Sequence, residues 1–349
     1  MVTTVGILDD SIIVRSALEK IIDSDPEFRV VGKAADPFKA REMILDEDPD
    51  VLTLDVEMPK LDGLTFLERI MEHHPMPVVM VSSLTESTTR KGMKALELGA
   101  VDVVGKPSGD TRDSIQTLKE DLLPKLKAAA RVSNGSGSVA RAGQIEETSE
   151  TTSVDITGTV NLIVIGASTG GTNVLLEIFR NLPEGLPPIM ITQHMPPVFT
   201  GQFSDHLDQE SEISVFEADE DGYVNRSEAV LAEGNRHLVV DGKPRGERVH
   251  YSTTDGEKVC FQRPAVDPLF ESAASHGKDS VLGIVLTGMG KDGLQGSKAI
   301  AGAGGTILVQ DEASCTVYGM PKQVKNNIAA AQEIPLDEIP SVLASLSER

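Results

Sequence analysis

Hydrophobic residues in the first third of the chain occur in short runs, and the stretches between the runs place apolar residues at helical spacing. The runs are Thr4–Leu8, Phe28–Ala34, Val51–Asp55, Pro77–Ser83 and Val101–Pro107. Runs of about four to eight apolar residues are typical of buried strands. Strands that alternate with helices predict a parallel sheet covered by helices on both faces. Five such units over residues 1–107 make one compact domain of the α/β class.

This alternation stops before the middle of the chain. The amphipathic stretch IQTLKEDLLPKLKAAARV is predicted to be helical, with a kink or break at Pro124. From about Ser133 to Ser153 the sequence is rich in Ser, Gly, Thr and Glu and has nothing that could bury a core. We expect a flexible linker over residues 126–157.

A second alternating region occupies residues 158–349. Its apolar runs are NLIVIG, PPIMITQ, EAVLAEG, RHLVV, SVLGIVLTG and GTILVQ. The segment VLAEGNRHLVVDG resembles a hairpin, so the predicted sheet is mixed rather than wholly parallel. This region is expected to be a doubly wound, mostly parallel α/β domain. A length of 349 residues also favours two domains over one.

The composition limits which partners the chain can have. The formal net charge is -22, and aromatic residues make up 3% of the chain. Such a chain repels phosphate backbones and has few rings on which bases could stack, which argues against nucleic-acid binding. The acidic excess also suits a high-salt cytoplasm that screens charge repulsion, and full stability and activity in dilute buffer would count against that hypothesis.

Three further features bear on location. No run of about 18 apolar residues occurs, so no membrane insertion is expected. The N-terminus, MVTTVGILDD, lacks the basic and long apolar segments of a secretory signal and is predicted to be a strand. The two cysteines, Cys260 and Cys315, form no disulfide framework, which fits a reducing compartment. The expected location is cytoplasmic.

Polar residues follow the predicted strands of the first domain. They are Asp9 and Asp10 after the first strand, Asp55 after the third, Ser82 after the fourth and Lys106 after the fifth. The carboxyl ends of parallel strands meet at one edge of a sheet, where ligands bind. Carboxylates gathered there repel each other unless a cation joins them, and oxygen ligands favour Mg²⁺. If the aspartates only capped helices or started turns, the agreement of five positions would be unexplained.

This set resembles that of a response-regulator receiver domain, and the resemblance covers essentially residues 1–125. It implies that residues 1–125 form a flavodoxin-like (βα)5 domain. It implies that Asp55 is the phospho-acceptor and that Ser82 and Lys106 contact the phosphoryl group. It also implies that phosphorylation needs Mg²⁺, with ligands from Asp10, Asp55, the backbone carbonyl of Glu57 and, through water, Asp9.

The stretch IVIGASTGGT in the second domain contains a G-x-S-x-G sequence, Gly166 to Gly170, which fits a nucleophile elbow. A predicted strand precedes it and a predicted helix follows it, as that motif requires. A phosphate-binding loop is the alternative. The lysine of a P-loop and the second glycine of a dinucleotide-binding motif are both missing, however. Ser168 is therefore predicted to be a nucleophile.

A nucleophilic serine needs a base, and His194 is the best placed of the seven histidines because it ends a predicted strand. Asp292 follows a third predicted strand and would orient the imidazole at the same sheet edge. A helix N-cap is the alternative role for Asp292. The chain order Ser-His-Asp differs from the Ser-Asp-His order of α/β-hydrolases, so the elbow does not imply that fold.

Several motifs of the second domain occur together: GASTGG, QHMPP, RPAVDPLF, LTGMGKDG and YGMPK. Together they resemble the catalytic domain of the chemotaxis protein-glutamate methylesterase family, CheB, whose order of receiver, linker and catalytic domain matches this chain. The resemblance implies that Ser168 is the nucleophile, His194 the base and Asp292 its orienting partner. It also implies that the backbone N–H of Met289 contributes to the oxyanion hole and that Thr169 helps to position the histidine.

The resemblance implies a phosphorylation-activated esterase that hydrolyses glutamate methyl esters on chemoreceptors, with a chemotaxis histidine kinase as phosphodonor. No metal or other cofactor is expected for ester hydrolysis itself. Deamidation of receptor glutamines, which some family members perform, stays open, as do the receptors, the kinase and the oligomeric state. The unphosphorylated first domain is expected to block the esterase site.

Two other function classes are alternatives. A signalling adaptor would use the second domain only for binding and would not react with a serine-directed probe. A nucleotide-binding domain would be stabilised against heat by nucleotide. A DNA-binding response regulator is opposed by the acidic charge and by the lack of a short basic helical output domain.

Overall fold

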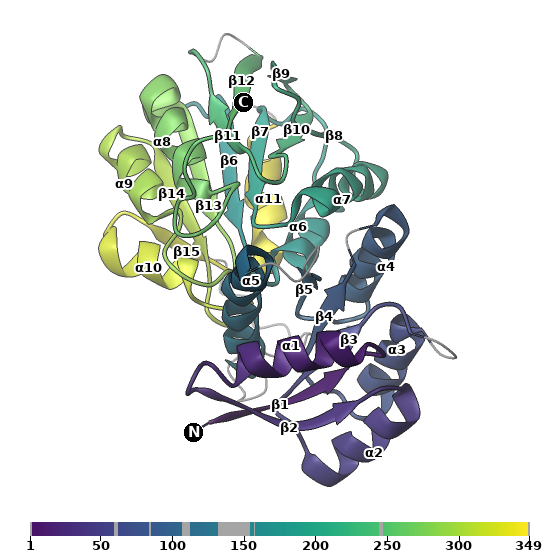
Figure 1. The fold of residues 1–349 in the computed structure, drawn as a ribbon. Helices are drawn as coiled ribbons and strands as arrows, with labels where there is room; N and C mark the ends of the chain where they lie inside the picture. The colour runs from purple at the N-terminus through teal and green to yellow at the C-terminus, as the bar shows by residue number, and fades with distance from the viewer. Residues whose placement is uncertain are drawn as a thin grey trace. The chain divides into compact units, whose positions relative to one another are not determined.

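The chain forms two compact units, divided between residues 139 and 140. Figure 1 shows both units in a computed structural model, which describes residues 2–58, 62–83, 85–106, 112–131, 154–156, 158–243 and 247–347. Within these ranges, no helix has the length and apolar character needed to cross a membrane.

The first unit is a five-stranded parallel sheet in the order β2-β1-β3-β4-β5. Its strands are β1 (Thr3–Leu8), β2 (Phe28–Ala34), β3 (Val51–Asp55), β4 (Val78–Ser82) and β5 (Asp102–Gly105). They alternate with α1 (Ile12–Ile22), α2 (Pro37–Glu47), α3 (Gly63–His73), α4 (Glu86–Glu97) and α5 (Arg112–Arg131). The predicted (βα)5 arrangement is confirmed, because each of the five apolar runs corresponds to one strand, with β1 beginning one residue before its run.

Helix α5 contradicts a break at Pro124 and the domain boundary predicted at 125. It runs through Pro124 without a break and ends at Arg131. Its Leu126, Ala129 and Ala130 side chains are buried in the core of the first unit. The boundary predicted at 125, with a linker over 126–157, is therefore too early, because the last turns of α5 contribute to this core. Residues 132–153, where the flexible linker is predicted, lie outside the described ranges.

The second unit contains a seven-stranded sheet in the order β15-β14-β13-β6-β7-β10-β8, and all of its pairings are parallel. Its strands are β6 (Leu162–Ala167), β7 (Ile189–Gln193), β8 (Ser214–Glu217), β10 (Glu228–Leu231), β13 (Val281–Val285), β14 (Thr306–Gln310) and β15 (Gln332–Ile334). A separate antiparallel sheet has the order β11-β12-β9 and contains β11 (His237–Val240), β12 (Arg248–Thr254) and β9 (Asp221–Asn225).

The predicted hairpin in VLAEGNRHLVVDG is wrong, and so is the mixed sheet inferred from it. Strand β10 pairs in parallel with β7 on one edge and with β8 on the other, so β11 finds no free edge there. Strand β11 instead pairs with β12 in the small sheet. The expected doubly wound, mostly parallel α/β class holds for the domain as a whole.

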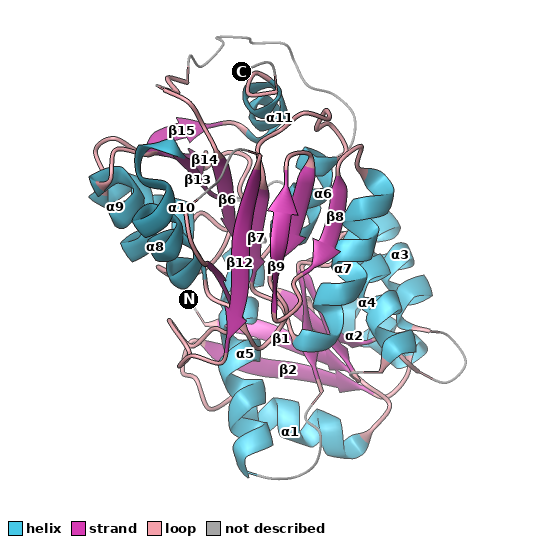
Figure 2. Cartoon of the chain, turned by 90° about the horizontal axis from the view of Figure 1, so that it is seen from above, coloured by secondary structure: helices cyan, strands magenta, loops and turns pink. Residues whose placement is uncertain are grey.

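Helices cover both faces of the large sheet. Figure 2 shows α8, α9 and α10 on one side of it and α6 and α7 on the other. The helices are α6 (Gly171–Phe179), α7 (Pro197–Glu210), α8 (Val266–Gly277), α9 (Leu294–Gly302), α10 (Met320–Asn327) and α11 (Ile339–Ala344), with the short 3₁₀ helices η2 (Lys278–Ser280) and η3 (Leu336–Glu338). Because β6, β7 and β13 are neighbours, the loops after these strands lie side by side at the carboxyl edge of the sheet.

Candidate active site and phosphorylation site

Ser168 lies on a tight turn between the last residue of β6 and the start of α6. Its backbone N–H donates to the carbonyl of Thr287 at 3.0 Å, and the N–H of Gly171 donates to the Ser168 carbonyl at 2.8 Å. Gly170 has a φ of 78°, in the left-handed region that favours glycine. The strand, turn and helix that a nucleophile elbow requires are all present.

His194 follows the last residue of β7, on the strand next to β6. Its backbone N–H donates to the carbonyl of Ala167 at 3.1 Å, which extends the pairing of the two strands by one residue. The Nδ1 atom of its ring lies 3.0 Å from the Oγ of Ser168. The two residues are 26 positions apart in sequence and meet because their strands are neighbours.

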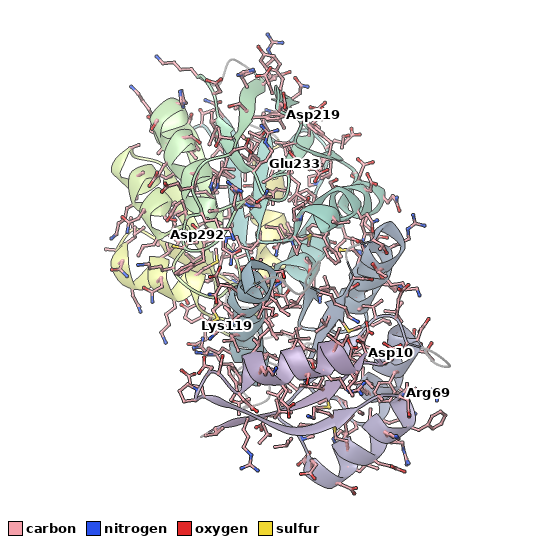
Figure 3. All side chains as sticks on the ribbon, viewed as in Figure 1. Asp10, Arg69, Lys119, Asp219, Glu233 and Asp292 are labelled. Atoms are coloured by element: carbon pink, nitrogen blue, oxygen red, sulfur yellow. The ribbon has the colours of Figure 1, made fainter. Side chains whose placement is uncertain are left out.

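Asp292 completes the arrangement from the loop between β13 and α9, and Figure 3 labels it in the second unit. Its Oδ2 lies 2.7 Å from the Nε2 of His194. The same carboxylate also accepts hydrogen bonds from the backbone N–H groups of Val266, Asp267 and Gly293. Burial alone would raise the pKa of Asp292, but the hydrogen bonds from His194 and the backbone lower it below its usual value. Asp292 is therefore ionised at neutral pH.

These contacts determine the tautomer of the histidine. An ionised carboxylate only accepts hydrogen bonds, so the Nε2 of neutral His194 carries the proton and donates to Asp292. The Nδ1 then has a free lone pair that faces the Ser168 hydroxyl. The ring nitrogen on the serine is thus Nδ1, whereas in chymotrypsin-type triads it is Nε2. In both arrangements one nitrogen takes a proton while the other is held by a carboxylate.

The loop that carries Met289 also lies near this group, and Thr169 directly follows Ser168 in the chain. A Cβ built on Gly288, the neighbour of Met289, would lie 2.6 Å from the Cβ of Ser168, so this loop passes directly beside the serine. Within the described ranges, no backbone or side-chain group accepts a hydrogen bond from the N–H of Met289. The hydrogen bonds of the described site include none between the side chains of Thr169 and His194; the carbonyl of Thr169 accepts one from Thr287 Oγ1.

Two residues of this site were not singled out from the sequence. Gln193 is buried, and its amide donates to the carbonyls of Ser168 and His194 at 2.9 and 3.2 Å, which ties the two loops together. A polar residue at the end of an otherwise apolar strand was the available signal. Asp267 lies beside Asp292, and its only sequence signal was its place in the RPAVDPLF motif.

The acidic residues of the first unit also converge. The Nζ of Lys106 lies 2.8 Å from a carboxylate oxygen of Asp9 and 2.7 Å from one of Asp55. Carboxylate oxygens of Asp9, Asp10 and Asp55 all lie within 4.8 Å of one another. Asp10, labelled in Figure 3, is exposed, whereas Asp9 and Asp55 are buried. The side chain that caps helix α1 is that of Ser11, so capping does not account for this cluster.

Burial and repulsion from Asp9 both disfavour the ionised form of Asp55, which a nearby cation would stabilise. Burial raises its pKa to about 6, the hydrogen bond from Lys106 opposes this effect, and the nearby charge of Asp9 adds to it. One lysine for two buried carboxylates leaves negative charge that a further cation would neutralise. The oxygen-only donor set of Asp9, Asp10 and Asp55 therefore fits Mg²⁺. Ser82 is buried at the end of β4, next to the strand that carries Asp55.

Comparisons with known proteins match both units of the chain. The CheB methylesterase family profile matches residues 163–343, and the response regulator receiver domain profile matches residues 5–118. The chain is 41% identical over 349 residues to protein-glutamate methylesterase/protein-glutamine glutaminase 2 of Pseudomonas aeruginosa, with 100% of this chain and 98% of that protein covered. It is 44% identical over 335 residues to the protein-glutamate methylesterase/protein-glutamine glutaminase of Thiobacillus denitrificans, with 96% and 94% covered.

A solved structure matches the second unit. The Thermotoga maritima CheB methylesterase catalytic domain is 36% identical, with a TM-score of 0.51, and the match covers 54% of this chain and all of that domain. A family profile over more than half of the chain and relatives aligned over nearly its full length settle the family. The chain belongs to the CheB methylesterase family, with a response regulator receiver domain ahead of its catalytic domain.

Proposed function

We propose that this chain is a phosphorylation-activated serine esterase that hydrolyses methyl esters of glutamate side chains on chemoreceptors. The observation that carries the proposal is the continuous chain of contacts from Ser168 Oγ to His194 Nδ1 at 3.0 Å and from His194 Nε2 to Asp292 at 2.7 Å. Such a chain activates a hydroxyl that is otherwise a weak nucleophile.

The reaction proceeds in two steps. Ser168 Oγ attacks the ester carbonyl while His194 Nδ1 takes the hydroxyl proton, and Asp292 stabilises the imidazolium. The tetrahedral oxyanion collapses, methanol leaves with the proton from His194, and an acyl-serine remains. Water, deprotonated by the same histidine, then releases the glutamate carboxylate and restores the serine.

Two further groups are assigned to the oxyanion and the histidine. The N–H of Met289 is the proposed oxyanion donor, because its loop lies against Ser168 and no described group accepts a hydrogen bond from it. Thr169, next to the nucleophile, is proposed to help position His194. Deamidation of receptor glutamines would use the same acyl-serine and release ammonia in place of methanol.

Control comes from the first unit. Asp55 is the proposed phospho-acceptor, and a chemotaxis histidine kinase is the proposed phosphodonor. Asp10, Asp55, the carbonyl of Glu57 and, through water, Asp9 would hold Mg²⁺, which would neutralise charge on the phosphoryl group. Lys106 forms an ion pair with Asp55 and would bind one oxygen of a phosphoryl group on this residue. Ser82 would bind another oxygen of the same group.

Methanol release from methylated receptor, with and without a small phosphodonor, tests this function. We expect phosphodonor to raise the rate for the wild-type chain. Ser168→Ala should lower turnover at least about 10³-fold and leave the fold intact by circular dichroism. A serine-directed probe should label the wild-type chain and not the variant. Retained turnover in Ser168→Ala would refute the nucleophile assignment, and an unlabelled wild-type chain would favour an adaptor.

A further inference from the structure

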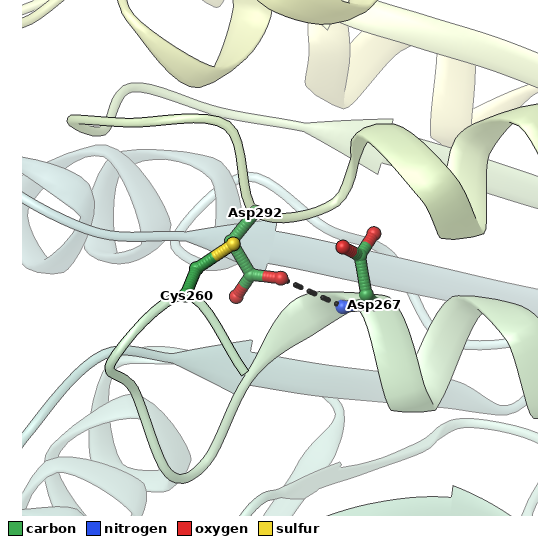
Figure 4. Close-up of side chains that lie close together, drawn as sticks. All are labelled: Cys260, Asp267 and Asp292. Atoms are coloured by element: carbon green, nitrogen blue, oxygen red, sulfur yellow. Dashed lines mark hydrogen bonds between the residues drawn. The ribbon is translucent and has the colours of Figure 1, made fainter. Parts of the chain in front are cut away.

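Asp267 is a buried carboxylate beside the triad that the proposed reaction does not use. It is the second residue of α8, and only 5% of its surface is exposed. Figure 4 shows its side chain close to those of Asp292 and Cys260, which come from two different loops. Oxygens of both carboxylates and the Cys260 sulfur lie within 4.8 Å of one another. A buried carboxylate so close to another requires an explanation.

The two aspartates cap each other's helices. Neither α8 nor α9 has a capping side chain at its own N-cap position, which is Ala265 in α8 and Gly293 in α9. Asp292, just before α9, accepts hydrogen bonds from the backbone N–H groups of Val266 and Asp267 at the start of α8, at 2.7 and 3.0 Å. In return, the Asp267 carboxylate accepts a hydrogen bond from the backbone N–H of Gly296, in the first turn of α9, at 2.8 Å.

This exchange depends on the close approach of the two helices. A Cβ built on Gly296 would lie 2.3 Å from the Cβ of Phe270 and 3.1 Å from the carbonyl oxygen of Asp267. Only glycine at this position lets the start of α9 reach the Asp267 carboxylate. The loop that carries Asp292 leads directly into α9, so a hydrogen bond that anchors α9 also determines where the Asp292 carboxylate lies.

We infer that Asp267 is a positioning residue, which holds the Asp292 loop against α8 and places a second negative charge behind the His194–Asp292 pair. The inference rests on the proposed esterase function, because it concerns the group that stabilises the imidazolium formed in each step. A carboxylate that is displaced or loses this support orients the imidazole less well, and small displacements of such groups slow catalysis strongly.

The charges around Asp267 are few and mostly negative. The negative charges are Asp292 from the loop before α9 and Glu271 one turn along α8, while Lys291 and Lys298 are exposed. The Cys260 thiol also lies close, and burial raises its pKa, so it stays neutral. Burial raises the pKa of Asp267 to about 6, the Gly296 N–H opposes this effect, and Asp292 adds to it. Asp267 is therefore charged at neutral pH and neutral below about pH 6.

A metal ion is not the explanation for this cluster. The two oxygens of Asp292 already accept four hydrogen bonds, from His194 Nε2 and from three backbone N–H groups. Binding a metal would remove Asp292 from these donors and leave the buried N–H groups at the start of α8 unsatisfied. The reciprocal capping accounts for both carboxylates without a metal.

Kinetics of the full-length chain with methylated receptor test the positioning role. Asp267→Ala removes the acceptor for Gly296, and we expect kcat to fall roughly 10- to 100-fold with KM within about twofold of wild type. Asp267→Asn keeps an acceptor oxygen, and we expect it to restore most of kcat at neutral pH. A wild-type kcat in Asp267→Ala, or an equal loss in both variants, would overturn the inference.

The pH profile tests the added charge and needs only the conservative variant. Asp267→Asn cannot become negative, so the reacting pair loses the neighbouring charge that Asp267 carries above about pH 6, and the acidic limb of kcat/KM should move to lower pH. We expect a displacement of roughly 0.5–1 pH unit. An acidic limb that coincides with that of wild type would refute the second charge, even if Asp267→Ala fails to fold.

Glu271→Gln is the matched control. It removes one negative charge from the exposed side of the same helix without touching Asp292, so kcat should be unchanged and the pH profile should move less than in Asp267→Asn. The labelling rate of Ser168 by a serine-directed probe provides a readout that needs no receptor. Wild-type labelling in both Asp267 variants, together with no labelling in Ser168→Ala, would end the inference and leave the esterase proposal standing.

Discussion

Asp292 shows how much a single side chain can be required to do. It accepts a hydrogen bond from Nε2 of His194, which orients the imidazole. It also accepts hydrogen bonds from three backbone N–H groups, and two of these cap α8. The alternative of a helix N-cap, considered from the sequence, is thus partly right. The capped helix is α8, which begins at Val266, 26 positions before Asp292, and not the helix that follows Asp292. The proposed catalytic role and the structural role coincide in one carboxylate.

Asp292→Asn separates these roles. The amide has one acceptor oxygen and adds an N–H₂ group that faces buried donors, so His194 loses its proper tautomer and α8 loses part of its cap. We expect turnover to fall roughly 10³- to 10⁴-fold and the free energy of unfolding to drop by about 1–2 kcal/mol. Methanol release and urea unfolding measure the two losses. A stability loss with wild-type turnover would contradict the assigned orienting role.

Asp55 makes the stability of the first unit depend on pH. Its pKa is about 6 in the folded chain against an ordinary value of 3.8, so the folded state binds more protons than the unfolded state between about pH 4 and 6. The stability present below that range should be lost as pH rises through it, by roughly 3 kcal/mol at most. Asp55→Asn should flatten this dependence in urea unfolding from pH 4.5 to 8 without Mg²⁺.

Two controls accompany this measurement. The exposed Glu42→Gln on α2 should leave the pH dependence unchanged, because it removes a solvated charge. Mg²⁺ should raise the stability of the wild-type chain at pH 7 more than that of Asp55→Asn. An equal response of the two chains to Mg²⁺ would argue against Asp55 as a ligand.

At the scale of elements, helix packing decided the end of the first domain. Proline removes one backbone N–H donor, so a break at Pro124 was a reasonable expectation. The helix nevertheless continues because the residues after Pro124 are apolar on one face, and Leu126, Ala129 and Ala130 bury that face in the core. Tertiary burial therefore outweighed the local preference of the backbone.

Leu126→Ala tests the corrected boundary. Leu126 has no exposed surface, and its truncation should destabilise the first unit by about 2–4 kcal/mol. Urea unfolding of the full chain, followed through the transition of the first unit, measures the loss. Glu120→Ala, at an exposed position of the same helix, should cost less than about 0.5 kcal/mol. If the two substitutions had equal effects, residue 126 would belong to the linker and not to the core of the first unit.

At the scale of the whole molecule, control requires that the first unit report its phosphorylation to the second. Deleting residues 1–150 should raise basal esterase activity roughly tenfold or more, because the proposed block is removed while the triad is intact. Asp55→Asn in the full chain should abolish the response to phosphodonor. Methanol release compares the three proteins. A truncated protein no faster than the unphosphorylated full chain would rule out simple blocking.

The sequence alone determined the features that depend on local patterns. Apolar runs predicted the strands, and polar residues at the ends of parallel strands predicted which side chains meet, because parallel strands place their carboxyl ends at one edge. Ser168, His194 and Asp292 could be selected for this reason, and so could Asp9, Asp55 and Lys106. Their roles in catalysis and phosphorylation stay predictions until the variants are measured.

The tertiary structure decided what depends on contacts between distant segments. Whether β11 pairs with β10 depended on which edges of β10 were already occupied, and the extent of α5 depended on the core beneath it. The exchange of caps between Asp267 and Asp292 joins residues whose local sequence shows no sign of the partner. Hydrophobic periodicity shows which side chains of one segment share a face. Strand pairing and helix capping, in contrast, depend on which of several distant segments reaches a given partner.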